Sequence, residues 1–205
     1  MSLSRRQLLH SAALLGIGHA LHSSLDFWVD FKRRFNIGAC DWSLGKSANI
    51  EAFELAKSIG LQGIQVNLGN LANDLHLRKA ELQAQYLAAS KTTGVKISSL
   101  AISELNNVPY KSDPRTEQWV SDSIDVARAF GVKVVLLAFF VKNDLRNDPA
   151  GIAEVIQRLK KVAPKAERAG VTLGIESYLT AEEHLHIMRE VGSPAIKVFY
   201  DFRNA

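Results

Sequence analysis

Two apolar runs, Val171-Thr172-Leu173-Gly174-Ile175-Glu176 and Ile196-Lys197-Val198-Phe199-Tyr200-Asp201, each end on a carboxylate. Both have the composition of strands, and a helix-like stretch near residues 180–191 lies between them. If they are parallel strands of one βαβ unit, Glu176 and Asp201 emerge at the same, carboxyl-terminal edge of a sheet. Neighbouring strands lie ~4.8 Å apart, so one divalent cation could contact both carboxylates. The sequence therefore predicts a metal site at this edge.

The same alternation of strand-like and helix-like segments extends from Phe35 onward, which predicts an α/β fold. The expected strands are short and mostly apolar, as is typical of parallel strands buried on both faces. They cover residues 35–40, 63–67, 95–101, 132–139, 171–176 and 196–201. The expected helices lie near residues 50–60, 78–93, 115–130, 150–169 and 180–191. Helix ends are marked by Gly60, Gly94, Gly131 and Gly170, and Pro164 is expected to kink the fourth helix or end its first part.

Repeated βα units form either an eight-stranded barrel or an open doubly wound sheet. No expected strand is followed by a glycine-rich dinucleotide or phosphate-binding motif, which favours a TIM (β/α)8-type barrel. A full barrel takes ~250 residues, whereas 171 remain when the first 34 are subtracted from 205. We therefore expect residues 35–205 to form an incomplete barrel of about six βα units. The first and sixth strands would then have unpaired edges, which predicts a homo-oligomer or aggregation.

The first 34 residues have the features of a twin-arginine-type signal peptide and linker. Arg5-Arg6 are followed by the apolar run 12–18 and by small residues through Ala20. This run is shorter than the ~20 residues of a stable membrane span. We therefore expect export to the periplasm, and the alternative is a leader that stays in the cytoplasm.

The net charge of +4 is concentrated in this leader. Its five basic and two acidic residues, removed from the totals of 25 and 21, leave 20 basic and 19 acidic residues. A body that is nearly neutral has no evident surface for nucleic acid. Cys40 is the single cysteine, so no internal disulfide is expected.

Four segments give the chain a family resemblance: residues 37–43, 136–140, 174–178 and 200–205. The chain resembles the sugar phosphate isomerase/epimerase family, whose members have a xylose isomerase-like TIM barrel. The resemblance implies that Glu176 and Asp201 bind a divalent metal, that Glu176 also acts as acid and base, and that Asn204 faces the substrate. Relatives add a His from the seventh strand and a Glu from the eighth, which this sequence lacks. We therefore expect an impaired isomerase or epimerase.

The expected chemistry is proton transfer next to the carbonyl of a sugar or sugar phosphate, which produces a negatively charged oxygen. Oxygen ligands favour magnesium or manganese over zinc. Trp42 could pack on the apolar face of a sugar, and Lys142 is a further candidate for substrate binding. Weaker candidates at strand ends are Asp41, Asn67, Glu104 and Tyr178.

The remaining polar candidates have structural interpretations. His184 and His186 lie two residues apart on a predicted helix, hence on different faces, and are expected at the surface. His76 is expected in a loop.

Two other functions are weighed against the isomerase hypothesis. An apurinic endonuclease-like enzyme would need several strand-end histidines and a basic face, and all six histidines lie away from the strand ends. A non-catalytic exported protein that binds a carbohydrate or a partner is the stronger alternative, because the last strands of the barrel are missing. No stable membrane span is expected.

Overall fold

The structure is a computed structural model and describes residues 35–203. The chain divides into two units, Met1–Ile37 and Gly38–Ala205, and the fold below is that of the second. The expected signal peptide at residues 1–34 and the candidate Asn204 lie outside the described residues. No helix within the described range is long and apolar enough to cross a membrane.

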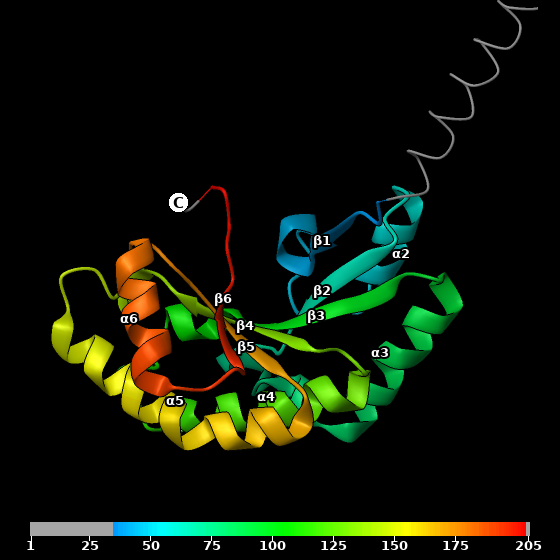
Figure 1. Ribbon diagram of the computed structural model, residues 1–205. Coiled ribbons are helices and arrows are strands. Elements are labelled where there is room, and N and C mark those ends of the chain that lie inside the picture. Colours follow the sequence, from blue (N-terminus) through cyan, green and yellow to red (C-terminus); the bar gives the residue numbers. More distant parts are fainter. Residues whose placement is uncertain (1–34, 204–205) are drawn as a thin grey trace, which may run out of the picture. The chain divides into compact units, whose positions relative to one another are not determined.

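Six parallel strands form one sheet in the order β1-β2-β3-β4-β5-β6, so each strand pairs with the next along the chain (Figure 1). The strands are β1 Gly38–Cys40, β2 Gly63–Asn67, β3 Lys96–Ile102, β4 Val134–Phe139, β5 Thr172–Ser177 and β6 Ile196–Val198. Sequential parallel pairing with helical crossovers is the topology of a (β/α) barrel, in which the carboxyl ends of all strands meet at one rim. The predicted α/β class and six βα units are confirmed.

Within residues 35–203, five α-helices alternate with the strands, and short 3-10 turns occupy several loops. The helices are α2 Ala52–Ser58, α3 Ala80–Thr93, α4 Arg115–Phe130, α5 Pro149–Ala169 and α6 Ala181–Val191. The 3-10 turns are η1 Asp41–Leu44, η2 Leu71–Asn73, η3 His76–Arg78, η4 Ser103–Asn106 and η5 Val141–Asn143. Gly94, Gly131 and Gly170 each adopt the left-handed conformation directly after a helix, as their sequence positions predict.

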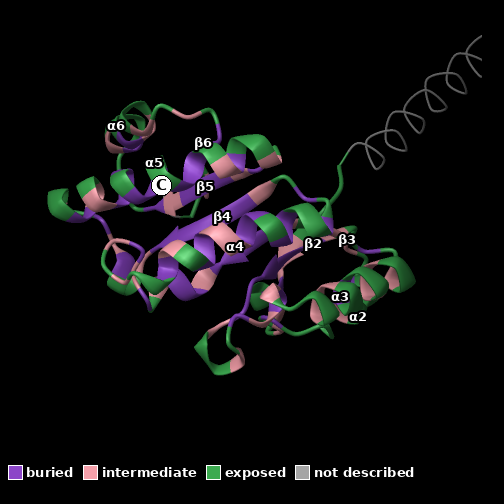
Figure 2. Cartoon of the chain, turned by 90° about the horizontal axis from the view of Figure 1, so that it is seen from below, coloured by how far each residue is buried: buried purple, intermediate pink, exposed green. Residues whose placement is uncertain are grey.

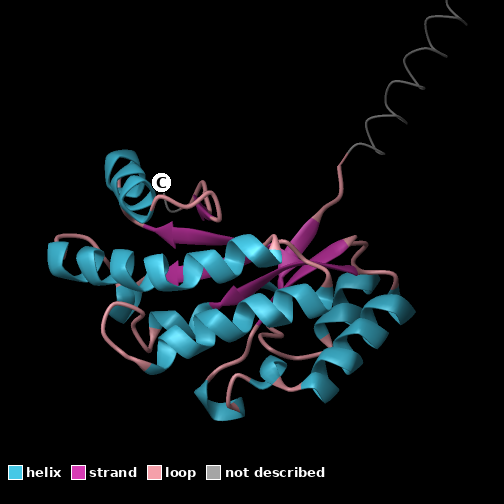
Figure 3. Ribbon diagram, turned by 60° about the horizontal axis from the view of Figure 1, so that its bottom comes forward, coloured by secondary structure: helices cyan, strands magenta, loops and turns pink. Residues whose placement is uncertain are grey.

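The strands have two differently packed faces. On β4, Val135, Leu137 and Phe139 join the large core beneath the helices, which Figures 1 and 3 show along one side of the sheet. The alternate residues Leu136 and Ala138 belong to a small inner cluster with Ala101. The strands β2, β4 and β5 are largely buried (Figure 2), whereas no residue of β1 is buried and two of the three β6 residues are exposed. The helices cover the outer face, so the inner face is the place to look for a site.

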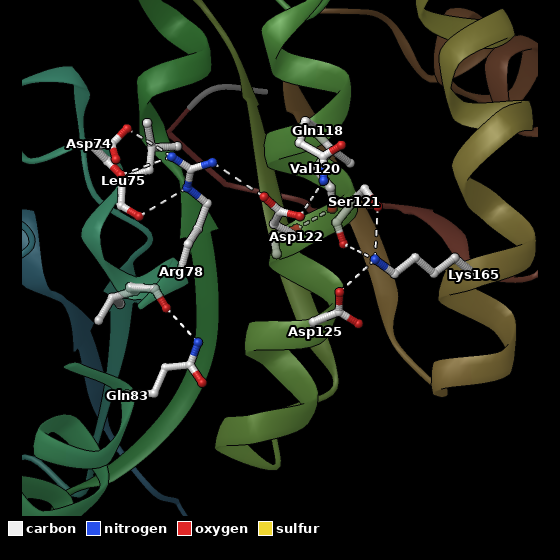
Figure 4. A network of polar contacts seen from close by, with 12 residues as sticks. Asp74, Leu75, Arg78, Gln83, Gln118, Val120, Ser121, Asp122, Asp125 and Lys165 are labelled. Carbon is white, nitrogen blue, oxygen red and sulfur yellow. Dashed lines mark hydrogen bonds and ion pairs between the residues drawn. The ribbon is translucent and has the colours of Figure 1, made fainter. Parts of the chain in front are cut away.

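Polar contacts tie the outer helical layer together (Figure 4). Arg78 in η3 reaches Asp122 of α4 at 3.4 Å, and Lys165 of α5 reaches Asp125 of α4 at 2.7 Å. These pairs are partly exposed and contribute little individually, about 0–1 kcal/mol each. They link η3 to α4 and α4 to α5 at the surface of the helical layer.

Three expectations about the elements were wrong in detail. Strands β1 and β6 are three residues long, shorter than the expected 35–40 and 196–201, because their ladders with β2 and β5 include only residues 38–40 and 196–198. Helix α5 does not end at Pro164. Proline removes one helical hydrogen bond, but the buried face of the helix continues on both sides of it. Its buried residues there are Leu159, Val162, Ala163 and Ala166.

The expected surface position of His184 was also wrong. Its side chain is buried, and both ring nitrogens have partners there: Nε2 lies 2.9 Å from Ser177 Oγ, and Nδ1 lies 3.0 Å from the carbonyl oxygen of Thr180. This arrangement fastens the first turn of α6 to the end of β5. His186 is exposed, as expected.

Candidate functional site

A cavity of about 470 Å³ opens at the carboxyl ends of the strands. Its walls come from the ends of β1 to β5 and from the segment after β6, the place where barrel enzymes hold their substrates. The lining residues are Cys40, Trp42, Ser43, Gln65, Ser103, Asn106, Leu136, Ala138, Phe140, Glu176, Tyr178, Phe199, Asp201 and Arg203. The cavity thus combines acidic, amide, hydroxyl and aromatic side chains.

Glu176 and Asp201 reach this cavity from neighbouring parts of the sheet. Glu176 lies in β5 opposite Ala138 of β4, and both residues face the interior. Asp201 lies three residues beyond β6 rather than at a strand end, and its Oδ1 accepts a hydrogen bond from Arg203 N at 2.8 Å. The structure therefore places the two predicted carboxylates on one cavity.

Gly174 explains how the segment after β6 comes so close to β5. Phe199 N donates to the carbonyl oxygen of Ile175 at 2.9 Å, which continues the strand pairing past Val198. A Cβ at position 174 would lie 3.0 Å from the Cβ of Phe199. The missing side chain therefore lets Phe199 pack inward and carry Asp201 to the cavity.

The pKa of the Cys40 thiol is raised by burial and by the nearby acidic groups. Burial, and after it the negative charges of Asp41, Glu176 and Asp201, raise the pKa of the Cys40 thiol to about 11. Its Sγ donates to Gln65 Oε1 at 3.1 Å, and Gln65 Nε2 donates to Ser99 Oγ at 2.8 Å. At neutral pH the thiol is therefore protonated and acts as a hydrogen-bond donor.

Aromatic side chains form another part of the wall. The rings of Phe140 and Tyr178 meet edge to face with centroids 4.7 Å apart. The guanidinium of Arg146 lies 4.5 Å from the Tyr178 ring centroid and is held by Asp144 at 2.6 Å. Trp42, 36% exposed, extends from η1. Such rings offer flat apolar surfaces to the C–H groups of a ligand.

Asp41 and Asn67 lie behind the wall and are almost fully buried, with 1% exposure each. Asp41 Oδ2 accepts hydrogen bonds from Asn67 N at 2.8 Å and Ala48 N at 3.0 Å. Asn67 Nδ2 donates to Ser103 Oγ at 2.6 Å and to Ser47 Oγ at 3.1 Å. These two residues therefore join the loops that follow β1, β2 and β3.

The other sequence candidates have different surroundings. Lys142 is exposed in η5 and is not among the residues that line the cavity. Glu104 is buried and also lies outside the lining, whereas Tyr178 belongs to it. His76 lies in η3, where its ring packs against the ring of Tyr86, and it does not line the cavity. Sequence reasoning missed Cys40, Gln65 and Ser103, which lie at the end of β1, within β2 and directly after β3. Asn106 begins the turn-rich stretch 106–110, which the sequence marks as a plausible substrate loop.

The cavity's donor set fits a hard divalent cation better than a soft one. Glu176 and Asp201 supply carboxylate oxygens, and the lining adds hydroxyl and amide oxygens. Within residues 35–203, no three His, Cys, Asp or Glu side chains are grouped closely enough to hold a metal by themselves. A cation here would need water or ligand oxygens in addition to the two carboxylates.

A second cavity, of about 540 Å³, lies beside α6 and is mostly apolar. It is lined by Leu179, Leu185 and Val198 among others, and shares Phe199 and Asp201 with the first cavity. Its few polar groups make it a poorer candidate for sugar chemistry.

The sequence matches the family described as "Xylose isomerase-like TIM barrel" over residues 53–205. It is also 27% identical, over 169 residues, to 2-epi-5-epi-valiolone 7-phosphate 2-epimerase from an Actinoplanes species. That alignment covers 82% of this chain, and the chain spans 62% of the length of the relative.

Solved structures resemble the chain in fold. A xylose isomerase-like TIM barrel protein from Mycobacterium smegmatis, in complex with magnesium, gives a TM-score of 0.68 at 16% identity and covers 84% of this chain and 66% of its own. D-psicose 3-epimerase with D-tagatose, from Clostridium cellulolyticum H10, gives a TM-score of 0.63 at 14% identity, with 80% and 62% covered. At these identities the likeness establishes the barrel fold.

Proposed function

The chain belongs to the xylose isomerase-like TIM barrel family, and we propose that its rim cavity is the site of a sugar or sugar phosphate isomerase or epimerase. The observation that carries this proposal is the meeting of Glu176 and Asp201 on one cavity. The similarity to 2-epi-5-epi-valiolone 7-phosphate 2-epimerase supports the reaction class.

Glu176 is the proposed proton-transfer group. It lies in β5, an interior strand paired with β4 and β6, and its side chain lines the cavity. A carboxylate fixed by a strand can remove a proton from a carbon next to a carbonyl and return it. Trp42 would contact the apolar face of the same sugar, and Asn204 remains a candidate for its polar groups.

We propose that Glu176 and Asp201 also hold a divalent cation, magnesium or manganese. When bound, such a cation would stabilise the negative charge that develops on the substrate oxygen. The magnesium complex of the M. smegmatis protein supports this choice. Binding of the cation to these two residues can be measured without any enzymatic activity.

Calorimetric titration of the chain with manganese tests the metal site. We expect binding that is lost in Glu176→Gln and in Asp201→Asn. The matched controls are Glu190→Gln and Asp125→Asn, two exposed carboxylates on the outer helices. A folded wild-type chain that does not bind manganese, or variants that bind as tightly as wild type, would exclude the proposed site.

Exchange of the substrate proton separates catalysis from binding. We expect the chain to incorporate deuterium from D2O next to the carbonyl of a ketose such as D-fructose, detected by NMR, and expect Glu176→Gln to abolish the exchange. If the sugar binds and no exchange occurs, the aromatic and polar cavity belongs to a carbohydrate-binding protein instead.

We further propose that residues 1–34 direct the chain to the periplasm. The adjacent Arg5 and Arg6 support this proposal. Cell fractionation should find the wild-type chain in the periplasm and an Arg5→Lys, Arg6→Lys variant in the cytoplasm. Equal distribution of the two would contradict it.

A further inference from the structure

The turn η4, which follows β3, presents two polar side chains to the cavity. Ser103 and Asn106 are its first and last residues, and both line the cavity. In a 3-10 helix the side chains at i and i+3 lie above one another. The two side chains therefore form one patch on the cavity wall.

The amide of Asn106 has a defined orientation. The backbone N–H of Phe140 donates to Asn106 Oδ1 at 2.9 Å, and an N–H can only donate. Oδ1 is thus the atom that faces Phe140, and Nδ2 with its two hydrogens lies on the other branch of the amide. The described residues provide no acceptor for these hydrogens.

Ser103 is oriented in a similar way through Asn67. Ser103 N donates to Asn67 Oδ1 at 3.3 Å, which fixes the Asn67 amide, and Asn67 Nδ2 then donates to Ser103 Oγ at 2.6 Å. In that bond Ser103 Oγ is the acceptor, so its own hydrogen remains for another partner. Within the described range, no protein acceptor receives it.

The cavity is consequently lined by two sets of polar residues that differ in their hydrogen-bonding chemistry. Glu176 and Asp201 offer acceptor oxygens, whereas Ser103 and Asn106 offer hydrogens. The Asn106 amide is oriented by Phe140 N, and the Ser103 oxygen is held by Asn67 Nδ2 while its hydrogen can rotate toward a ligand. Oriented donors at a partly buried site stabilise an oxygen that gains negative charge, because they need not reorient when the charge develops.

We propose that Ser103 and Asn106 are a donor pair that binds the carbonyl oxygen of a keto-sugar in this cavity. This inference rests on the proposed function and adds the residues that recognise the reacting oxygen. It also gives the substrate a direction, with its carbonyl toward η4.

Substitutions can separate the donor role from a structural one. Asn106→Asp keeps an oxygen for Phe140 N and replaces the amide donor by a second acceptor. Ser103→Ala removes the hydroxyl, and Ser103→Thr retains it. Ser47→Ala is the matched control, because Ser47 Oγ also accepts from Asn67 Nδ2 but does not line the cavity.

The experiment is calorimetric titration of the full chain and its variants with D-fructose, with and without manganese. We expect Asn106→Asp to weaken binding about tenfold or more and Ser103→Ala by roughly two- to tenfold, as for a lost hydrogen bond. Ser103→Thr and Ser47→Ala should stay within about twofold of wild type. Melting curves would establish that each variant is folded.

D-mannitol, which has a hydroxyl in place of the carbonyl, tests the assignment of the oxygen. We expect the substitutions to weaken D-mannitol binding less than D-fructose binding. Equal losses for both sugars, or wild-type D-fructose affinity in folded Ser103→Ala and Asn106→Asp, would overturn the inference. A chain that binds manganese but no D-fructose would also overturn it while leaving the metal site intact. D-fructose binding without manganese binding would instead overturn the metal proposal alone.

Discussion

Asp41 is a carboxylate whose burial opposes its charge. Desolvation raises its pKa to about 6, although hydrogen bonds from Asn67 and Ala48 act in the opposite direction. Oδ1 is buried without a hydrogen-bond partner among the described residues. An ionised Asp41 therefore costs stability, while its two backbone contacts hold the loop that carries Trp42.

This cost predicts a pH-dependent effect of Asp41→Asn. The pKa in the folded chain, about 6, lies above the ordinary value of 3.8, so stability from this group is fully present below pH ~4 and lost as the pH rises through 6. Asparagine keeps an acceptor oxygen and carries no charge. We expect the variant to gain on the order of 2–3 kcal/mol relative to wild type between pH 4 and pH 8.

Urea unfolding at both pH values measures this difference. Asp125→Asn, an exposed carboxylate paired with Lys165, is the control and should show no comparable gain. A variant equally affected at pH 4 and pH 8 would mean that Asp41 does not ionise in this range.

Single residues also show what the sequence could predict. Glu176, Asp201 and Trp42 were predicted because strand ends of a parallel sheet converge, and all three line one cavity. Lys142 follows β4 in the same way, but its turn directs it to solvent. His184 was placed wrongly because its burial depends on Ser177, seven residues earlier, and helix periodicity does not report such a contact.

At the scale of elements, the repeated pattern of strand and helix predicted the fold because each βα unit is locally encoded. The ends of β1 and β6 were less predictable. Apolar residues continue beyond both strands, but the regular ladders with β2 and β5 cover only residues 38–40 and 196–198, and past β6 the pairing continues through the bond from Phe199 N to the carbonyl oxygen of Ile175. The donor pair on η4 was not predicted either, since it depends on the orientations of Asn67 and Phe140 N.

The junction of β5 and β6 predicts that Gly174→Ala will disturb the site. The added Cβ would lie 3.0 Å from the Cβ of Phe199 and would displace the segment that carries Asp201. We expect a loss of roughly 1–3 kcal/mol in stability and weaker manganese binding in calorimetry.

Gly63→Ala in β2 is the matched control for this junction. The nearest atom to its added Cβ would be Ser98 Cβ at 3.5 Å, an ordinary contact. Gly63→Ala should therefore bind manganese as wild type does. If Gly174→Ala does so too, Phe199 does not position Asp201.

At the scale of the whole sheet, the residues that stabilise the fold and the residues that line the cavity lie on opposite faces. The outer face of β4 packs under the helices in the large core, and its inner face borders the cavity through a small cluster. Leu136 and Leu137 are adjacent and of the same residue type, yet they point to different faces. Leu137 is 0% exposed in the large core, and Leu136 is 3% exposed and lines the cavity.

This division predicts different consequences for two identical substitutions. Leu137→Ala leaves a void in a closed core and should cost about 2–5 kcal/mol in the free energy of unfolding. Leu136→Ala only enlarges an existing cavity that water can enter, so we expect a smaller loss in urea unfolding. Its effect should instead appear in D-fructose affinity, because Leu136 lines the cavity in which we propose that the sugar binds. Equal destabilisation by both substitutions would mean that the inner cluster is as much a part of the stabilising core as the helix-covered face.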